Sequence, residues 1–150
     1  MANTFRGPML DVTTTDLTTL ITVPTANPGA TPPVPPTTII IKSLIVCNDS
    51  GSATLLDVQT VRSSSTFKQF HQKSIAAGAT VDLLNQHDGI TGGMIVLQES
   101  DVLKVQANAA NQVHITVADM EVTKVNCKEK KNGFTITIYY TCYDDRDRRP

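Results

Sequence analysis

The residue types that most often bind metals or transfer protons are scattered along this chain. The three histidines, His71, His87 and His114, lack the HxH or HExxH spacing of metal sites, and zinc needs three or four converging nitrogen or sulfur ligands. The segments Asp49-Ser50-Gly51 and His87-Asp88-Gly89 lack the repeated acidic positions of a calcium-binding loop. We interpret both segments as turns, and the sequence predicts no metal site and no cofactor.

Catalytic nucleophiles and paired carboxylates are equally sparse. The chain has no G-x-S-x-G motif that would present a catalytic serine beside a base. Glu99 and Asp101 flank a turn, and their spacing does not place them on one cleft, as a glycosidase pair requires. The glycines Gly89, Gly92 and Gly93 precede no predicted helix, so they do not form a phosphate-binding loop. The sequence therefore predicts a protein that is not an enzyme and has no catalytic residues.

The cysteines and the basic residues leave alternatives open. Cys47, Cys127 and Cys142 form an odd set without CxxC spacing, which fits synthesis in a reducing cytosol. A Cys127–Cys142 pair across a hairpin remains an alternative. The cluster of Lys128, Lys130 and Lys131 is interrupted by an acid, and the net charge is −1, so the chain does not favour nucleic acid as a partner. We interpret the cluster as a solvated hairpin tip, with a local nucleic-acid contact as the alternative.

Composition limits what the core and surface contain. Hydrophobic residues make up 40% of the 150 residues, aromatic residues only 5%, and tryptophan is absent. The core must therefore consist mainly of Val, Ile, Leu and Ala. Charged residues are 18%, below the usual quarter, and a polar but uncharged surface suits contacts with other subunits. The N-terminus lacks the pattern of a signal peptide, and no stretch approaches the roughly 18 apolar residues of a membrane span, so we expect no membrane association.

Short β-prone runs alternate with turn residues along the chain, and no 3.6-residue period is present. Strands are predicted at residues 17–23, 37–48, 53–62, 67–75, 80–84, 94–98, 102–107, 113–122 and 134–143. This pattern predicts an all-β, antiparallel, jelly-roll-like β-sandwich. Residues 37–48 are apolar on both faces, as expected of a central strand or one covered on both sides. Residues 37–62 are predicted to form a hairpin, with Phe67 and Phe70 as anchors of the strand that follows.

Three regions are predicted. Residues 1–36 form an extended N-terminal arm, irregular over residues 1–16, because six of the 8 prolines lie between Pro24 and Pro36 and favour a semi-rigid, polyproline-like spacer. Residues 37–122 form the sandwich core. Residues 123–150 form an added C-terminal hairpin around Asn132-Gly133 and a charged tail. Deleting residues 1–36 is expected to leave a folded β domain with weakened self-assembly.

Three turn patterns resemble those of a known group of proteins. Residues 37–51, Ile75-Ala76-Ala77-Gly78-Ala79-Thr80, and the segment 97–107 (LQESDVLKVQA) are similar to the opening hairpin, the I-x-A-G-x-T turn and the L-x-x-G-D-x-L turn of small virion structural proteins of tailed bacteriophages. Residues 113–122 resemble their last core strand. Ser100 stands where that pattern usually has glycine, so it should cost some stability if the position requires a positive φ.

The resemblance implies a non-enzymatic part of a phage particle, either a capsid decoration protein or a neck- or tail-associated protein. Such a protein is made in the host cytoplasm and located in the virion, where its partners are further copies of itself and other virion proteins. The alternative is a host-surface or carbohydrate-binding module of a fibre or baseplate. Sugars usually stack on exposed aromatic rings, and Tyr139, Tyr140, Tyr143 and the phenylalanines are the candidates for that role.

Overall fold

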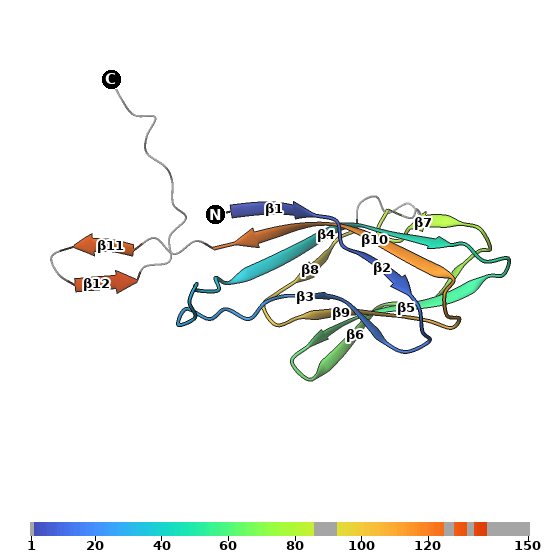
Figure 1. Cartoon of the computed structure of the whole chain (residues 1–150), viewed down its shortest axis with the longest axis horizontal. Coiled ribbons are helices and arrows are strands. Elements are labelled where there is room, and N and C mark those ends of the chain that lie inside the picture. The colour runs from blue at the N-terminus through green and yellow to red at the C-terminus, as the bar shows by residue number, and fades with distance from the viewer. Residues whose placement is uncertain (1, 86–92, 125–127, 132–133, 138–150) are drawn as a thin grey trace, which may run out of the picture.

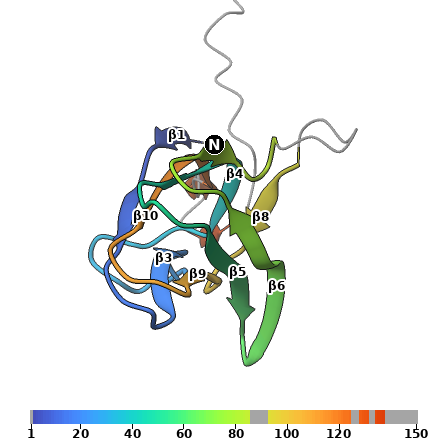
Figure 2. The same cartoon turned by 90° about the vertical axis from the view of Figure 1, so that its right-hand side faces the viewer.

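The structure is a computed structural model that describes residues 2–85, 93–124, 128–131 and 134–137, the last two segments by their backbone alone. Its strands form two antiparallel sheets that pack face to face (Figures 1 and 2). The described residues contain no helix. The predicted all-β, antiparallel sandwich is therefore confirmed.

The larger sheet is built around two long central strands. Its six strands are β1 (Ala2–Arg6), β2 (Met9–Val12), β4 (Thr37–Asn48), β7 (Thr80–Asp82), β8 (Ile95–Leu97) and β10 (Val113–Thr123). β1 and β2 lie end to end along β10, while β7 and β8 lie end to end along β4. Pro8 separates β1 from β2 because it has no N–H for the ladder, and its carbonyl accepts a hydrogen bond from Val117 N at 2.9 Å.

The smaller sheet consists of β3 (Thr18–Thr22), β9 (Val102–Ala107), β5 (Thr54–Arg62) and β6 (Ser65–Ile75), in that order. The hairpin predicted over residues 37–62 is therefore wrong, because β4 and β5 belong to different sheets. The buried Asn48 holds the corner between them. Its side-chain amide nitrogen donates to the carbonyls of Ser52 and Ile75, and its oxygen accepts from Ser50 N at 3.1 Å. These bonds tie the end of β4 to the end of β6 and turn the chain from one layer to the other.

A third, separate pair of strands follows the sandwich. β11 (Lys128–Lys131) and β12 (Phe134–Thr137) form a two-stranded antiparallel sheet, with Lys131 opposite Phe134. This pairing confirms the hairpin predicted in the C-terminal region. The predicted continuation of the last strand to residue 143 and the possible Cys127–Cys142 pair lie outside the described residues.

The core between the two sheets is aliphatic. Its buried hydrophobic residues are Val12, Ile21, Val23, Ile39, Ile41, Leu44, Val46, Leu56, Val58, Ile75, Leu83, Leu84, Ile95, Leu97, Leu103, Val105, Ala107, Val113, Ile115 and Val117. All are Val, Ile, Leu or Ala, as the composition predicts. Phe70 packs against this core from a partly buried position. Phe67 is 52% exposed, so its predicted role as an anchor is wrong. It lies on the edge strand β6, which pairs with β5 on one side alone.

A β-bulge changes which face of β4 is buried. Asp119 of β10 pairs with Ile41, and the preceding Ala118 pairs with Ser43, so Lys42 is an extra residue on β4. Before the bulge the odd-numbered residues of β4 are buried, and after it the even-numbered ones are buried. The bulge therefore accounts for part of the apolar character on both faces that the sequence shows.

The N-terminal segment belongs to the sandwich over most of its length. β1 and β2 pair with β10, and β3 pairs with β9. Val12 is fully buried, and Ile21 and Val23 are 6% and 1% exposed. The expectation of an irregular arm over residues 1–16, outside a core that begins at residue 37, is therefore wrong. These residues occupy sheet edges that would otherwise leave backbone groups and apolar side chains of the core uncovered.

The proline block forms a closed loop rather than a straight spacer. Asn27 N donates to Val34 O at 2.9 Å, and Val34 N donates to Asn27 O at 3.0 Å. The chain between these two residues turns back on itself and contains a cis Thr31–Pro32 peptide bond. The prediction of an extended, polyproline-like spacer is therefore wrong for the middle of residues 24–36.

Candidate functional site

The two carboxylates that flank the predicted turn at residues 99–101 have separate structural partners. Asp101 is 1% exposed, and its carboxylate accepts hydrogen bonds from Arg62 Nη2 at 2.6 Å and from Gln98 N at 2.7 Å. The Arg62 guanidinium holds the pKa of Asp101 below its ordinary value. Glu99 Oε1 instead accepts from Ala26 N at 2.6 Å. The two acids therefore fix the β8–β9 turn and do not form a catalytic pair.

Ser100 lies between these acids in a left-handed backbone conformation. Its φ is 67°, in the region that non-glycine residues adopt at a cost. Its hydroxyl lies 2.8 Å from Thr25 Oγ1. Residue 100 therefore has a positive φ. This is the case in which the sequence predicted that serine, in place of glycine, costs some stability.

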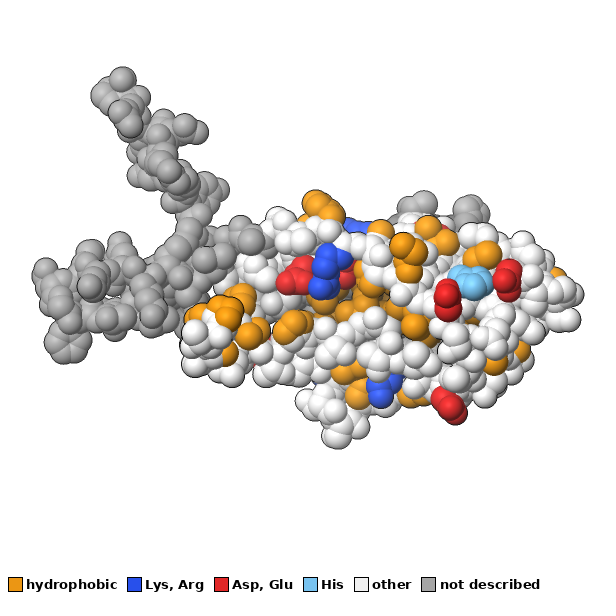
Figure 3. All heavy atoms as spheres, viewed as in Figure 1, with side chains coloured by type: hydrophobic (Ala, Val, Ile, Leu, Met, Phe, Trp, Pro, Cys, Tyr) orange, Lys and Arg blue, Asp and Glu red, His pale blue; other side chains and the backbone are white. Residues whose placement is uncertain are grey.

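His114 is held by two aspartates on the outer surface of the larger sheet. Its Nδ1 donates to Asp11 Oδ1 at 2.7 Å, and its Nε2 donates to Asp49 Oδ2 at 3.1 Å. The hydrogen bond to Asp11, and then the one to Asp49, raises the pKa of His114. Figure 3 shows a histidine between two acidic side chains on this surface. The carboxylates bond to the ring itself, so the trio braces β2, β10 and the β4–β5 turn.

His71 belongs to a second brace, centred on Asp57. Asp57 Oδ1 accepts from Gln72 N at 2.5 Å and lies 3.0 Å from His71 Nδ1, while Lys68 Nζ lies 3.3 Å from Asp57 Oδ2. Gln72 has a φ of 48° and lies where the β5–β6 register shifts, so it forms a bulge in β6. The Gln72 N–H is the main cause that lowers the pKa of Asp57. Asp57 therefore stabilises an irregular point in the edge strand.

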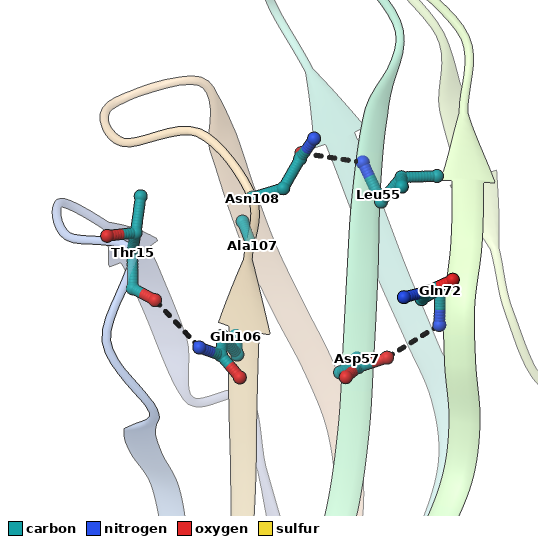
Figure 4. A pocket seen from close by; sticks show the side chains of 7 residues that line it. All are labelled: Thr15, Leu55, Asp57, Gln72, Gln106, Ala107 and Asn108. Atoms are coloured by element: carbon teal, nitrogen blue, oxygen red, sulfur yellow. Dashed lines mark hydrogen bonds between the residues drawn. The ribbon is translucent and has the colours of Figure 1, made fainter.

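An open depression of about 350 Å³ lies beside this brace, between β5, β9 and the β2–β3 loop (Figure 4). Two of its polar side chains hold neighbouring backbone: Gln106 Nε2 donates to Thr15 O at 2.9 Å, and Asn108 Oδ1 accepts from Leu55 N at 2.8 Å. Asp57 is occupied by Gln72, as described above. The seven lining residues labelled in Figure 4 include no aromatic ring and no cysteine. The depression therefore offers polar contacts, and its labelled lining residues provide no aromatic ring on which a ligand could stack.

One buried carboxylate was missed by the sequence analysis. The Asp119 side chain is fully buried, its Oδ2 lies 3.1 Å from Arg6 Nη2, and its Oδ1 has no hydrogen-bond partner among the described residues. Arg6 Nη1 also lies 2.7 Å from Glu121 Oε2. Asp119 continues the alternation of the buried Val113, Ile115 and Val117, and this signal could have placed it on the inner face. The cluster ties β1 to β10.

Metal and membrane sites can be assessed over the part of the chain that the structure describes. Within that part, no group of three or more His, Cys, Asp or Glu side chains is arranged to hold a metal ion. No helix in the same part is long and apolar enough to cross a membrane. Several candidate residues lie outside it: His87, Asp88, Gly89, Gly92, Cys127, Cys142, Tyr139, Tyr140 and Tyr143. The side chains of the lysine cluster at residues 128–131 are also outside it.

A row of apolar side chains crosses the outer face of the larger sheet. Phe5 of β1 pairs in register with Met120 of β10, Met120 with Ile40 of β4, and Ile40 with Val96 of β8. Phe5 is 80% exposed and Val96 is 43% exposed, while Met120 and Ile40 are half-buried. These four residues therefore present hydrophobic surface to solvent across the full width of the sheet.

A second row runs parallel to the first. Met9 of β2 pairs with Thr116 of β10, and Thr116 pairs with Ile45 of β4. Met9 is 78% exposed and Ile45 is 38% exposed. The apolar residues of the two rows are Phe5, Met9, Ile40, Ile45, Val96 and Met120, and we refer to these six residues as the apolar face. Hydrophobic side chains stand along this side of the molecule in Figure 3.

The apolar face is the feature that sequence reasoning recovered in part. The strand at residues 37–48 was predicted to be apolar on both faces, which indicated a central strand or one covered on both sides. The contributions of β1, β2 and β8 were not predicted, because the pairing that brings them beside β4 and β10 cannot be read from their own short sequences.

Comparison with known proteins gives no relative from which a function can be transferred: no protein family, no curated protein and no solved structure matches the chain.

Proposed function

We propose that this chain is a non-enzymatic structural component of a tailed-phage virion, either a capsid decoration protein or a neck- or tail-associated protein. In this role it stabilises the particle through contacts between subunits. The observation that carries the proposal is the apolar face. Exposed apolar patches of this kind mark interaction sites, whereas scattered single hydrophobic residues need no explanation.

The acidic side chains support a structural role. Asp57, Asp82 and Asp101 each accept a backbone N–H at an irregular point of the fold, namely a bulge or a turn. In each case the carboxylate closes an irregular point of the scaffold, which gives it a structural role.

The β8–β9 turn supports the resemblance on which the virion assignment depends. In the L-x-x-G-D-x-L pattern, the position before the aspartate here has a φ of 67°, and the aspartate itself closes the turn. These two facts give the pattern a physical reason. Glycine adopts a positive φ readily at the position of Ser100, and a buried carboxylate at the position of Asp101 accepts the hydrogen bonds that close the turn. The pattern thus serves the architecture of a sandwich rather than an active site.

The test asks whether the chain is part of purified phage particles. The particles come from a lysate in which the chain is expressed. Particles are purified by density gradient, and the copy number of the chain is measured by quantitative mass spectrometry relative to the major capsid protein. The chain is expected to band with the particles at a fixed ratio. A ratio near that of the capsid protein indicates decoration, and a much lower fixed ratio indicates the neck or tail. Absence from the particles would contradict the proposal.

A further inference from the structure

We propose that the apolar face binds the same face of a second copy of this chain, giving a homodimer in which the two larger sheets pack on each other. The inference rests on the proposed function, because it names the partner and the surface through which such a component assembles. The contact is isologous, since the same residues are used on both copies.

The size of the apolar face suits a dimer contact. It spans four strands, about 4.8 Å apart, and roughly six residues of about 3.3 Å each, so the backbone beneath it covers an area of roughly 15 by 20 Å. Phe5 is 80% exposed, and a phenylalanine ring buries on the order of 150 Å² or more when it is covered. Two such outlines together cover roughly 600 Å², and the side chains that project from them raise the buried area toward the roughly 1,200 Å² at the lower end for specific interfaces.

The charges around the apolar face are few. No member of the apolar face is charged, and the exposed Lys42 at the β4 bulge adds one positive charge between the two rows. At one border Asp82 is already engaged, because its carboxylate accepts from Ser43 Oγ at 2.6 Å and from Leu44 N at 3.1 Å. At the next row along the sheet, His114 lies between the carboxylates of Asp11 and Asp49, at 2.7 Å and 3.1 Å. The six apolar residues themselves therefore carry no charge that would select an oppositely charged partner.

The edge strand β6 is poorly suited to the same task. A free strand edge can pair with another chain unless charges or bulges prevent it. β6 carries Lys68 and Lys73 and is interrupted by the bulge at Gln72, whose backbone N–H is already bonded to Asp57. Assembly through this edge is thereby opposed, while the apolar face is open. Face-to-face packing of two sheets, with a separation of about 10 Å, is an ordinary way to cover such a surface.

The test measures the oligomeric state of the full-length chain by sedimentation velocity, up to roughly 100 μM protein. A dimer is expected, with a dissociation constant on the order of micromolar for a contact of this size. Because the contact is apolar, raising the salt concentration to about 1 M should not dissociate it. Phe5→Ser removes one ring from each copy and is expected to weaken the dimer by about 100-fold or more.

A matched control separates the apolar face from exposed phenylalanine in general. Phe67→Ser removes an exposed ring from β6 of the smaller sheet, and it should leave the dissociation constant unchanged. Phe5 is so exposed that its replacement should not unfold the chain, which circular dichroism checks. In parallel, the ¹³C-methyl signals of Met9 and Met120 should shift on dilution through the dissociation constant.

Two outcomes overturn the inference. The chain could remain monomeric over the whole concentration range, which would show that the apolar face does not join two copies. Alternatively, the oligomer could persist in Phe5→Ser, which would place the contact elsewhere. Either result leaves the proposed function standing if the chain is found in particles. Conversely, the chain could form a dimer that depends on Phe5 and yet be absent from particles. That result would support the dimer contact and contradict only the virion role.

Discussion

Three aspartates specify the places where the fold departs from regular strands. Asp82 bonds the bulge of β4 through Leu44 N, Asp57 bonds the bulge of β6 through Gln72 N, and Asp101 bonds the β8–β9 turn. Each supplies an acceptor to a backbone N–H that the sheet ladder does not use, which avoids the cost of an unpaired donor. In this chain, single carboxylates therefore close irregular points of the two sheets.

The conformation of Ser100 predicts a specific difference between two substitutions. Ser100→Gly should relieve the left-handed strain at φ 67°, whereas Ser100→Ala keeps the strain. Both lose the hydroxyl contact with Thr25, so that loss cancels in the comparison. The Gly variant should be more stable than the Ala variant by about 1 kcal/mol, after the greater flexibility of glycine in the unfolded chain is counted. Urea unfolding measures the difference, and equal stabilities would show that the turn does not hold residue 100 at positive φ.

The His114 brace predicts a pH-dependent contribution to stability. Asp11, and then Asp49, raises the pKa of His114 in the folded state. The contribution of His114 to the free energy of unfolding is therefore fully present below its unfolded pKa of about 6.5. This contribution is lost as the pH rises through the pKa of His114 in the folded state. Wild type should exceed His114→Gln in free energy of unfolding near pH 6 by less than about 1 kcal/mol, because solvent screens these exposed groups. The difference should vanish by about pH 9.

The salt dependence of this difference in free energy of unfolding tests whether its origin is ionic. At about 1 M salt, the advantage of wild type near pH 6 should shrink, because the Debye length falls to about 3 Å. Measurements below about pH 4.5 are excluded, since the aspartates begin to protonate there. A difference between wild type and His114→Gln that does not change with pH would contradict an ionic brace.

At the scale of elements, the N-terminal strands are predicted to be essential. Deleting residues 1–16 removes β1 and β2, uncovers the edge of β10 and leaves the buried Asp119 without its Arg6 partner. The truncated chain should lose its cooperative unfolding transition, because an unpaired buried charge and an exposed core edge are each strongly destabilising. Thermal unfolding followed by circular dichroism measures this result.

A point substitution tests the same claim without truncation. Val12 is fully buried, so Val12→Ala should lower the free energy of unfolding by about 2 kcal/mol. The neighbouring Thr13 is exposed, and Thr13→Ala should change it by less than about 0.5 kcal/mol. If both variants were as stable as wild type, the segment would be a peripheral arm, as the prolines alone suggested.

The element scale also shows where sequence reasoning succeeds and where it ends. The strands at residues 37–48 and 102–107 were predicted with the observed bounds, because alternation and turn residues are local signals. The pairing of β4 with β10, and its separation from β5, depends on the Asn48 corner and could not be read locally. The role of residues 1–12 was missed because short edge strands receive much of their stability from the strands beside them.

At the scale of the whole molecule, two thin layers share an aliphatic core, and one layer carries the apolar face on its outer side. The fold class followed from composition and from the spacing of turns. The apolar outer side of β4 followed in part, but the apolar face as a whole did not, because it is assembled from β1, β2, β4, β8 and β10, which are distant in sequence. The absence of a metal site and of catalytic residues remains a prediction from the spacing of residues in the sequence.

The dimer predicts that thermal stability depends on protein concentration. Unfolding of a dimer yields two chains, so a tenfold rise in concentration adds about 1.4 kcal/mol per dimer by mass action. With two chains of 150 residues and an unfolding entropy of about 2.1 cal/mol/K per residue, Tm should rise by about 2 °C for each tenfold increase. Phe5→Ser should abolish the dependence at moderate concentration, and Phe67→Ser should retain it. A wild-type Tm that is constant from low to high concentration would show that the apolar face does not join two copies in solution.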